Sequence, residues 1–487
     1  MDKQREDFVL AQLRGILPGS ALITDPVAAR PFESDGLTAI RQLPWAVALP
    51  GDVEQVRAVL AVCRNNEIPV VTRGAGTGLS GGARPSTDGL LLGMSRMSRI
   101  LEIDAENRCA RVQPGVANLA ISQAVADLGL YYAPDPSSQI ACSIGGNVAE
   151  NSGGVHCLKY GLTVHNILAL KLQTIAGEEL ILGSGGYDAP AYDLLALLTG
   201  SEGLLGVITE VTVRLLPVPQ TRQVMLAAFE GVEQAADAVA TIIANGIIPA
   251  GLEMMDKLAI RAAEDFVHAG YPLNAAAILL CELDGTAEEV NDLIDKVAAL
   301  VRSSGAFDVR VAANATDQQR LWAGRKAAFP AVGRLAPDYY CMDGTIPRAS
   351  LGRVLLEIGR LSAEFGLEVA NVFHAGDGNL HPLILYDANQ PGQLERAEQM
   401  GASILELCIS AGGTITGEHG VGVEKIDQMC SQFTSPELEQ FHRVRSAFDP
   451  ARMLNPGKAI PTLARCAELG GMHVHRGQLP HPELERL

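Results

Sequence analysis

The feature that most constrains this chain is the glycine-rich segment at residues 73–82, which reads "RGAGTGLSGG". Five of its ten residues are glycine, and Thr77 and Ser80 add hydroxyl groups. Glycine lets the backbone form a concave surface whose N–H groups point at anionic oxygen, so a pyrophosphate is the expected ligand. The alternative is a flexible surface loop, which the density of glycine and the strand pattern before it disfavour.

A dinucleotide-binding Rossmann motif is a second interpretation of these glycines. That motif needs G-x-G-x-x-G at the start of a helix, and an acidic residue after the next strand. Here the segment continues through Pro85 into the apolar stretch "GLLLGM" at 89–94, without a helical pattern. The sequence therefore disfavours a Rossmann NAD site.

Two further glycine-rich segments follow, at 134–161 and 199–211. Three such loops in succession predict that the chain wraps one long, extended cofactor. Pro217 and Pro219 then end a strand pattern and mark a domain boundary. Beyond them helical stretches alternate with strands, a pattern typical of helices packed on an antiparallel sheet.

Length, charge and cysteine content narrow the class of protein. A chain of 487 residues predicts two or three domains, and a net charge of −18 without a long Lys/Arg block disfavours nucleic acid as a partner. The nine cysteines include no Cys-x-x-Cys pair, which disfavours disulfides and an iron–sulfur cluster and favours a reducing compartment. No apolar run approaches the ~18–20 residues that span a bilayer, and the N-terminus lacks a signal-peptide core. We therefore expect a soluble, cytoplasmic protein.

The spacing of apolar residues predicts two helices near the N-terminus. One face of the first is expected to consist of Phe8, Leu10, Leu13 and Leu17. The second is expected to begin after Asp52 as its N-cap and to bury Val56, Val59, Leu60 and Cys63.

Two histidines, His374 and His381, flank a turn-rich stretch within "VFHAGDGNLHP". Glycine, aspartate and asparagine between them predict a hairpin-like reversal that brings the two imidazoles together. Such a pair can share a divalent ion. Histidines that are only hydrogen-bonded at strand ends are an equally good interpretation of this stretch alone.

A second polar stretch, "TGEHGVG" at 416–422, places Glu418 and His419 between glycines. This is an unusual place for core residues and a common one for site residues. With the two histidines, Glu418 completes a His₂Glu set that suits zinc or another first-row divalent ion with open coordination positions. The alternative for Glu418 is a solvated loop carboxylate.

In their order, the three glycine-rich segments resemble the FAD-binding domain of the vanillyl-alcohol oxidase/para-cresol methylhydroxylase (PCMH) superfamily. "FHAGDGNLHP", "TGEHGVG" and "LNPGK" resemble its FAD-linked 2-hydroxy-acid branch, which contains D-lactate dehydrogenases, D-2-hydroxyglutarate dehydrogenases and the FAD subunits of bacterial glycolate oxidases. Residues 321–348 and 465–487 look most like the last group. The resemblance extends from about residue 40 to residue 460.

The resemblance implies an α+β fold in four parts. These are an N-terminal helical segment at 1–40, a two-part PCMH-type FAD-binding domain at 41–219, an α+β cap or substrate domain with an antiparallel sheet at 220–450, and a C-terminal helical segment at 451–487 that returns to the flavin.

The resemblance also implies the FAD-binding residues. The first loop would hold the pyrophosphate through Arg73, Gly74, Ala75, Gly76, Thr77, Gly78, Leu79, Ser80, Gly81 and Gly82. Other parts of the cofactor would meet Pro134, Ser137, Ser138, Gly145, Gly146, Asn147, Asn151, Gly153, Gly154, Gly206, Ile208 and Asn455. The first loop has no histidine to which FAD could be attached, so we expect non-covalent FAD.

For the chemistry, the resemblance implies that His374, His381 and Glu418 bind Zn, Mn or Fe. His419 matches the catalytic base and Arg325 the arginine that binds the substrate carboxylate, with Asn379 bordering the substrate. The reaction would convert a 2-hydroxy acid to the 2-oxo acid with hydride transfer to flavin N5. Where relatives acting on hydroxyglutarate have a threonine and a lysine near the second carboxylate, this chain has Phe329 and Cys341, which favours glycolate or D-lactate.

The implied partners are a second FAD-type subunit and an iron–sulfur subunit that passes electrons to quinone, with peripheral association at the inner face of the cytoplasmic membrane. Three alternatives remain at this point. The chain is a stand-alone D-lactate or D-2-hydroxyglutarate dehydrogenase, a non-catalytic FAD scaffold, or a zinc hydrolase in which the glycine loops are purely structural.

Overall fold

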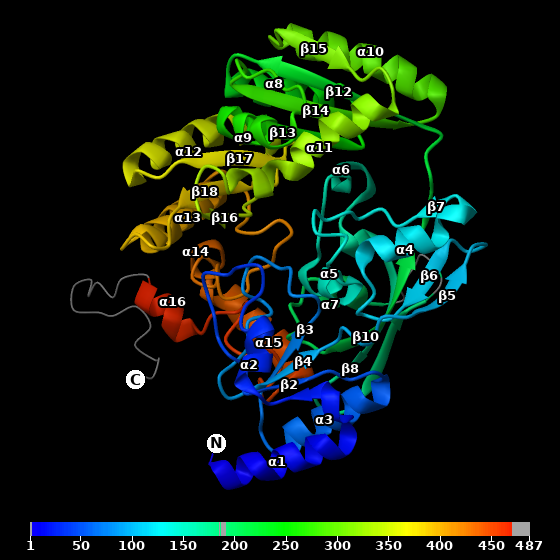
Figure 1. The fold of residues 1–487 in the computed structure, drawn as a ribbon, viewed down its shortest axis with the longest axis vertical. Coiled ribbons are helices and arrows are strands. Elements are labelled where there is room, and N and C mark those ends of the chain that lie inside the picture. The colour runs from blue at the N-terminus through cyan, green and yellow to red at the C-terminus, as the bar shows by residue number, and fades with distance from the viewer. Residues whose placement is uncertain (1, 185, 187–190, 470–487) are drawn as a thin grey trace. The chain divides into compact units, whose positions relative to one another are not determined.

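The computed structural model describes residues 2–184, 186 and 191–469 (Figure 1). Its chain divides into two compact units. Unit 1 comprises Met1–Ser152, Leu162–Pro217 and His419–Leu487, and unit 2 comprises Gly153–Gly161 and Val218–Glu418. The break at residue 217 lies two positions before the expected boundary, whereas residues 419–450 fall in unit 1 and not with the expected cap domain.

The first sheet of unit 1 has four strands in the order β1-β2-β4-β3. β1 pairs with β2 in antiparallel orientation, and β2, β4 and β3 run parallel. Helices α1 and α3 pack together beside this sheet over one apolar core. The elements are α1 (Lys3–Ile16), β1 (Leu22–Ile23), α2 (Pro26–Ala29), β2 (Ala46–Ala48), α3 (Val53–Asn65), β3 (Val70–Arg73) and β4 (Leu90–Gly93).

The two expected N-terminal helices are present, but one buried face differs. Asp52 caps α3, and the four apolar residues predicted for that helix are all buried. In α1 the inward face contains Val9, and Phe8 is 59% exposed. The predicted inward position of Phe8 was therefore wrong, because the true stripe begins one residue later.

The second sheet of unit 1 has five antiparallel strands in the order β5-β6-β10-β8-β9. Its central strand β10 alternates buried and partly exposed residues, as expected when one face of a sheet is covered. The elements of this part are β5 (Ile100–Asp104), β6 (Cys109–Val112), α4 (Asn118–Val125), β7 (Leu130–Tyr131), α5 (Ile144–Glu150), β8 (Ile167–Gln173), β9 (Glu179–Gly183), α7 (Leu194–Leu198), β10 (Val207–Arg214) and β11 (Leu216–Pro217).

The C-terminal segment joins unit 1 through the edge of the first sheet. Val70 in β3 donates its N–H to Met453 O at 2.8 Å, and Asn455 donates its N–H to Val70 O at 2.7 Å. The last part of unit 1 begins at His419 and contains the helices α14 (Met429–Gln432), α15 (Ser435–Phe448) and α16 (Leu463–Leu469). Part of the C-terminal helical segment expected at 451–487 thus lies in unit 1, and residues 470–487 are outside the described part of the chain.

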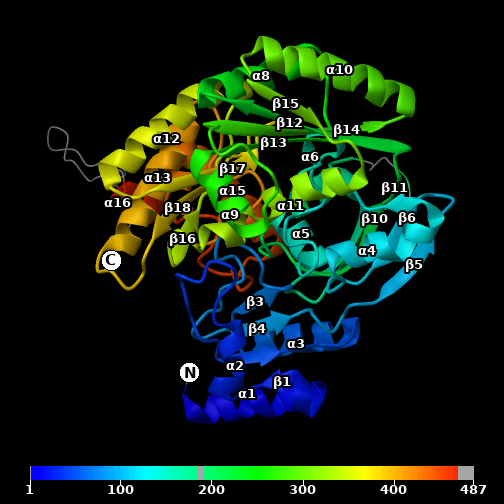
Figure 2. The ribbon, with the colours of Figure 1, turned by 45° about the horizontal axis from the view of Figure 1, so that its top comes forward.

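Unit 2 is built on a seven-stranded sheet in the order β15-β12-β14-β13-β17-β18-β16, with every neighbouring pair antiparallel. Helices α8 and α10 contact each other and the sheet, and α9 and α11 form a second packed pair (Figure 2). This is the α+β architecture that the sequence predicted. The strands are β12 (Thr221–Phe229), β13 (Gly251–Asp256), β14 (Ala277–Gly285), β15 (Asp308–Val311), β16 (Asp338–Cys341), β17 (Val369–His374) and β18 (Pro382–Tyr386).

One helix of unit 2, α6, precedes its strands, and the others lie between them or after them along the chain. The helices are α6 (Cys157–Tyr160), α8 (Val232–Ala244), α9 (Lys257–Val267), α10 (Ala287–Ser303), α11 (Ala315–Val332), α12 (Leu351–Phe365) and α13 (Gln393–Ser410). Among the helices of the described residues, none combines the length and apolar character needed to cross a bilayer.

A disulfide between Cys430 and Cys466 links α14 to the middle of α16. The expectation that the cysteines remain unpaired was therefore wrong for this pair. Its members lie 36 positions apart, and only the tertiary packing of the C-terminal segment brings them together. The other seven cysteines are buried and form no disulfide within the described residues.

Replacing Cys430 with serine removes this cross-link, and loop-closure entropy predicts a loss of up to about 3–4 kcal/mol in the free energy of unfolding. Denaturant unfolding of the oxidised proteins measures it, with Cys109→Ser, a free cysteine of β6, as the matched control. If Cys430 and Cys466 are both alkylated in folded protein without reductant, the pairing is absent in solution.

Candidate active site

The candidate metal ligands of unit 2 are brought together by the end of strand β17 and the turn that follows it. His374 is the last residue of β17, and His381 directly precedes β18. Gly378 adopts φ +84, and a side chain there would approach Ile346 O to 2.2 Å, so the turn requires glycine. The predicted reversal is confirmed by the antiparallel pairing of β17 with β18.

Both imidazoles face the carboxylate of Glu418. Its Oε1 lies 3.3 Å from His374 Nε2 and 3.1 Å from His381 Nε2, and the two rings are 5.1 Å apart at an angle of 82°. All three residues are buried. Two imidazole nitrogens and one carboxylate oxygen thus converge on a common point, and this donor set fits a first-row divalent ion.

Asp343, two residues after β16, is part of the same cluster and was missed in the sequence. One oxygen lies 3.6 Å from His381 Nε2, and ligand atoms of Asp343, His381 and Glu418 all lie within 4.8 Å of one another. Its carboxylate also accepts the N–H groups of Gly417 and Glu418, each at 3.2 Å. Asp343 therefore holds the backbone that presents Glu418, besides offering a further ligand atom.

Glu253 in β13 is the second residue that the sequence analysis missed. Its Oε1 lies 2.7 Å from His374 Nδ1, and its Oε2 accepts hydrogen bonds from Arg325 Nε at 2.8 Å and pairs with Nη2 at 2.7 Å. The register of the sheet causes this contact, because Glu253 and His374 are direct partners across β13 and β17. A carboxylate on Nδ1 fixes the ring and directs Nε2 toward a metal, as is common behind metal-binding histidines. The available signal was a glutamate within the buried strand "GLEMMD".

The charged groups of this cluster shift one another's pKa values. Burial lowers the pKa of His374, but the carboxylates of Glu253 and Glu418 outweigh it and hold that pKa well above its usual value. Burial raises the pKa of Glu418, yet hydrogen bonds from the two histidines hold it well below its usual value. In the metal-free protein the cluster therefore keeps protons on the imidazoles, and a cation would compete with those protons.

Arg325 and Asn379 lie in the same unit as the histidines. Arg325 in α11 is only 2% exposed, and Glu253 occupies one edge of its guanidinium. Asn379 is in the turn between the histidines, where its side chain packs against Gly417. Asn379 Oδ1 is buried and accepts no hydrogen bond from the residues that the structure describes.

His419 follows Glu418 in the chain but belongs to unit 1. The structure divides the predicted chemistry at this peptide bond, with the ligands and Arg325 in unit 2 and the base at the start of a unit 1 segment. Of the predicted cofactor residues, Gly153 and Gly154 belong to unit 2, and all the others belong to unit 1.

The first glycine loop of unit 1 has the properties expected for binding a pyrophosphate. Ala75 N donates to Ser143 Oγ at 3.2 Å, and a side chain at Gly74 would approach that oxygen to 2.2 Å. The N–H groups of Gly76, Thr77 and Gly78 donate no hydrogen bond within the described chain. A side chain at Gly78 would meet nothing within 4 Å. This backbone therefore offers free donors beside open space, which fits an anionic ligand.

Other predicted cofactor residues surround this loop within unit 1. Asn147 in α5 is buried, and its Oδ1 accepts a hydrogen bond from Asn118 Nδ2 at 3.1 Å. Asn455 Nδ2 donates to Gly82 O at 3.2 Å and to Glu202 O at 2.6 Å. The C-terminal segment thus reaches the first glycine loop, and contact of Asn455 with the flavin stays a prediction.

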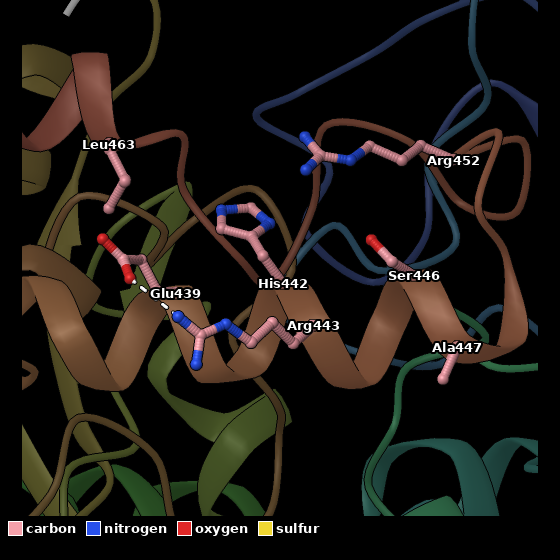
Figure 3. Close-up of a pocket in the computed structure, with 7 residues that line it drawn as sticks. All are labelled: Glu439, His442, Arg443, Ser446, Ala447, Arg452 and Leu463. Atoms are coloured by element: carbon pink, nitrogen blue, oxygen red, sulfur yellow. Dashed lines mark hydrogen bonds and ion pairs between the residues drawn. The ribbon is translucent and has the colours of Figure 1, made fainter. Parts of the chain in front are cut away.

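A separate hollow of about 580 Å³ lies along α15 (Figure 3). It is lined by side chains of α15 together with Arg452 and Leu463, and Glu439 pairs with Arg443 at 3.2 Å within it. None of the residues predicted for the cofactor, metal or substrate contributes to this hollow.

Replacing Glu253 with glutamine removes the charge behind His374, so we expect metal affinity to fall by about 10–100-fold. Metal content after dialysis against graded chelator concentrations measures the change. Glu282→Gln is the matched control, because Glu282 is a buried glutamate of the neighbouring strand that contacts His156 and Trp322. Equal metal retention in both variants would contradict the role of Glu253.

Two family models match the chain, an FAD binding domain over residues 44–183 and the C-terminal domain of FAD linked oxidases over residues 218–459. The glycolate oxidase subunit GlcD of Escherichia coli (strain K12) is 63% identical and covers 98% of this chain and 96% of its own length. A D-lactate dehydrogenase of Archaeoglobus fulgidus is 34% identical, with 86% and 92% covered.

Among solved structures, p-cresol methylhydroxylase has the same fold, with a TM-score of 0.80 at 17% identity over 95% of this chain and 98% of that one. The PCMH-type fold and the predicted family are thereby confirmed. By its matched domains and full-length relatives, this chain belongs to the FAD-linked oxidases.

Proposed function

We propose that this protein oxidises a small 2-hydroxy acid, glycolate or D-lactate, to the 2-oxo acid with non-covalent FAD and a divalent metal. The observation that carries the proposal is the convergence of His374, His381 and Glu418 in a chain of the FAD-linked oxidases. A flavoprotein that only transfers electrons needs no such donor set. A hydrolase would not need the FAD-binding domain, so membership of this family disfavours the zinc hydrolase.

Two bound groups would supply chemistry that the side chains lack. FAD would accept the two electrons and the α-hydrogen of the substrate, held by the loop of Arg73–Gly82 and by Asn455. A Zn, Mn or Fe ion on His374, His381 and Glu418 would act as a Lewis acid that lowers the pKa of the substrate hydroxyl.

The chain itself would bind the substrate and remove one proton. Arg325 pairs with the substrate carboxylate through the edge of its guanidinium that Glu253 leaves open, and Asn379 borders the substrate. Neutral His419 takes the hydroxyl proton, while the α-hydrogen leaves with its electron pair. The products are the 2-oxo acid, the reduced cofactor and protonated His419.

The substrate is proposed to carry one carboxylate. Phe329 packs edge-on against the His381 ring with centroids 6.2 Å apart, and Cys341 is buried at the end of β16. Neither residue can pair with the second carboxylate of a hydroxyglutarate. The names of the relatives, glycolate oxidase subunit and D-lactate dehydrogenase, support a small monocarboxylate.

We propose that the electrons pass to partner subunits. The Escherichia coli relative is named as a subunit, which supports a complex with a second FAD-type subunit and an iron–sulfur subunit that reduces quinone. Such a complex would lie in the cytoplasm at the inner face of the membrane. A stand-alone D-lactate dehydrogenase is the second candidate, which the 34% identical relative favours.

Anaerobic addition of glycolate or D-lactate should bleach the flavin absorbance near about 450 nm, and prior removal of metal with a chelator should abolish the bleaching. L-lactate and D-2-hydroxyglutarate are the comparison substrates. Faster bleaching by hydroxyglutarate contradicts the proposed substrate, and full bleaching by the metal-free protein contradicts the role of the metal.

A His419→Ala variant should retain FAD and metal but reduce its flavin about 10²–10⁴-fold more slowly, because the hydroxyl proton has no acceptor. Stopped-flow reduction at saturating substrate measures this rate. His442→Ala, a histidine of α15, serves as the control. An unchanged rate in His419→Ala would assign the base to another group.

A further inference from the structure

The turn that follows His419 is held by a buried carboxylate of unit 1. We propose that Glu202 is a positioning residue for His419, a role that rests on the proposed function of this histidine as the base. Glu202 lies in the third glycine-rich segment and is only 6% exposed. The sequence analysis had assigned it no function.

The carboxylate of Glu202 accepts two hydrogen bonds from consecutive peptide groups. Val421 N donates to Oε1 and Gly422 N donates to Oε2, each at 2.7 Å. Both bonds are short, and each uses a different oxygen of the same carboxyl group. Because the two oxygens bind successive N–H groups, the turn cannot shift or rotate without breaking one of the two hydrogen bonds.

Three carbonyl oxygens of this turn, those of Gly420, Val421 and Gly422, also have partners within unit 1. Lys425 Nζ donates to Gly420 O at 2.8 Å, and Lys425 N donates to Val421 O at 3.0 Å. Ala459 N donates to Gly422 O at 2.9 Å. These contacts hold the carbonyl groups, whereas Glu202 alone holds the two N–H groups.

The backbone of the turn permits little adjustment. Gly420 and Gly422 adopt φ +80 and +55, a region disfavoured for residues with a side chain. A side chain at Gly422 would approach Ser80 O to 2.1 Å, and one at Gly420 would approach the Glu150 carboxylate to 2.1 Å. The turn is therefore packed directly against the first glycine loop and α5.

Glu202 itself is held in an unfavourable conformation. Its φ is +50, where glycine is the usual residue. Its N–H donates to Ala149 O at 2.8 Å, and its carbonyl oxygen accepts a bond from Asn455 at 2.6 Å. A glutamate at this φ is strained, and its side chain accepts the two hydrogen bonds that hold the turn.

The consequence for catalysis follows from chain connectivity. His419 is bonded to Gly420, so fixing Gly420 O and the N–H groups of Val421 and Gly422 fixes the two peptide planes that follow Gly420, and this restrains the backbone of His419 one residue earlier. Through Asn455, which also binds Gly82 O, Glu202 connects this turn to the loop assigned to the pyrophosphate. Glu202 thus positions the proposed base, His419, without contacting a reacting atom.

Glu202→Gln tests the inference, because it keeps the shape but presents an NH₂ group to a peptide N–H. In the FAD-loaded protein we expect the flavin content to stay the same and the rate of flavin reduction by glycolate to fall by about 10²-fold. The half-saturating substrate concentration should change less than about threefold, because Arg325 and the metal ligands are untouched. The pH profile of the reduction rate should shift, and Glu202→Asp should recover part of the rate.

Glu210→Gln is the matched control, because Glu210 is a glutamate of β10 in the same unit that pairs with Arg111 and Lys171. Amide hydrogen exchange provides a second readout that needs no substrate. The amides of Val421 and Gly422 should exchange faster in Glu202→Gln and remain unchanged in Glu210→Gln.

Two outcomes would overturn the inference. One is a Glu202→Gln variant that reduces its flavin at the normal rate, and the other is one that loses FAD while the rate per bound flavin is unchanged. If the unmodified, metal-loaded protein is reduced by none of the 2-hydroxy acids, the proposed function fails. Reduction of the unmodified protein with an unaffected variant rejects only the role of Glu202.

Discussion

The contact between Glu253 and His374 is the interaction on which the polar centre of unit 2 depends. It exists because β13 and β17 pair in a register that places the two residues directly opposite each other. A shift of one residue would turn Glu253 to the other face of the sheet, and the buried Arg325 would lose its partner. The same carboxylate therefore orients a proposed metal ligand and neutralises an arginine that could not otherwise remain buried.

Buried charged groups also hold their neighbours in place in unit 1, where those neighbours are backbone groups of loops. There a buried carboxylate holds peptide N–H groups, and buried lysines hold carbonyl groups of the loops around it. Lys458 Nζ donates to Gly82 O at 2.8 Å and to Asn455 Oδ1 at 2.7 Å, and burial lowers the pKa of Lys458 to about 7. In both units the charged groups work mainly by fixing backbone and neighbouring side chains in place.

Local signals in the sequence predicted local structure well. The N-cap and apolar spacing of α3, the strand after the first glycine loop and the reversal between His374 and His381 each depend on residues near one another in the chain. The prediction for Phe8 failed because Phe8 and Val9 are both apolar neighbours of Leu10, and only the packing of the helix decides which of the two is buried.

What the sequence could not provide were contacts made by tertiary packing. Glu253 is 121 positions from His374, and Asp343 is 75 positions from Glu418. Neither spacing has a recognisable pattern, because strand order in the sheet decides which residues meet. The disulfide between Cys430 and Cys466 could not be predicted from the sequence for the same reason. Resemblance to a family named the candidate metal ligands, whereas the residues that contact them required the structure.

The chain passes between its two units four times, and the last passage falls between Glu418 and His419. A proposed metal ligand and the proposed base are thus neighbours in sequence but members of different compact bodies. Exchange of one body between relatives at this junction would therefore join a proposed ligand and a proposed base that come from different parent chains. Relatives with different substrate preferences are therefore expected to have diverged by point substitutions around residues such as Phe329, and not by exchange of whole domains.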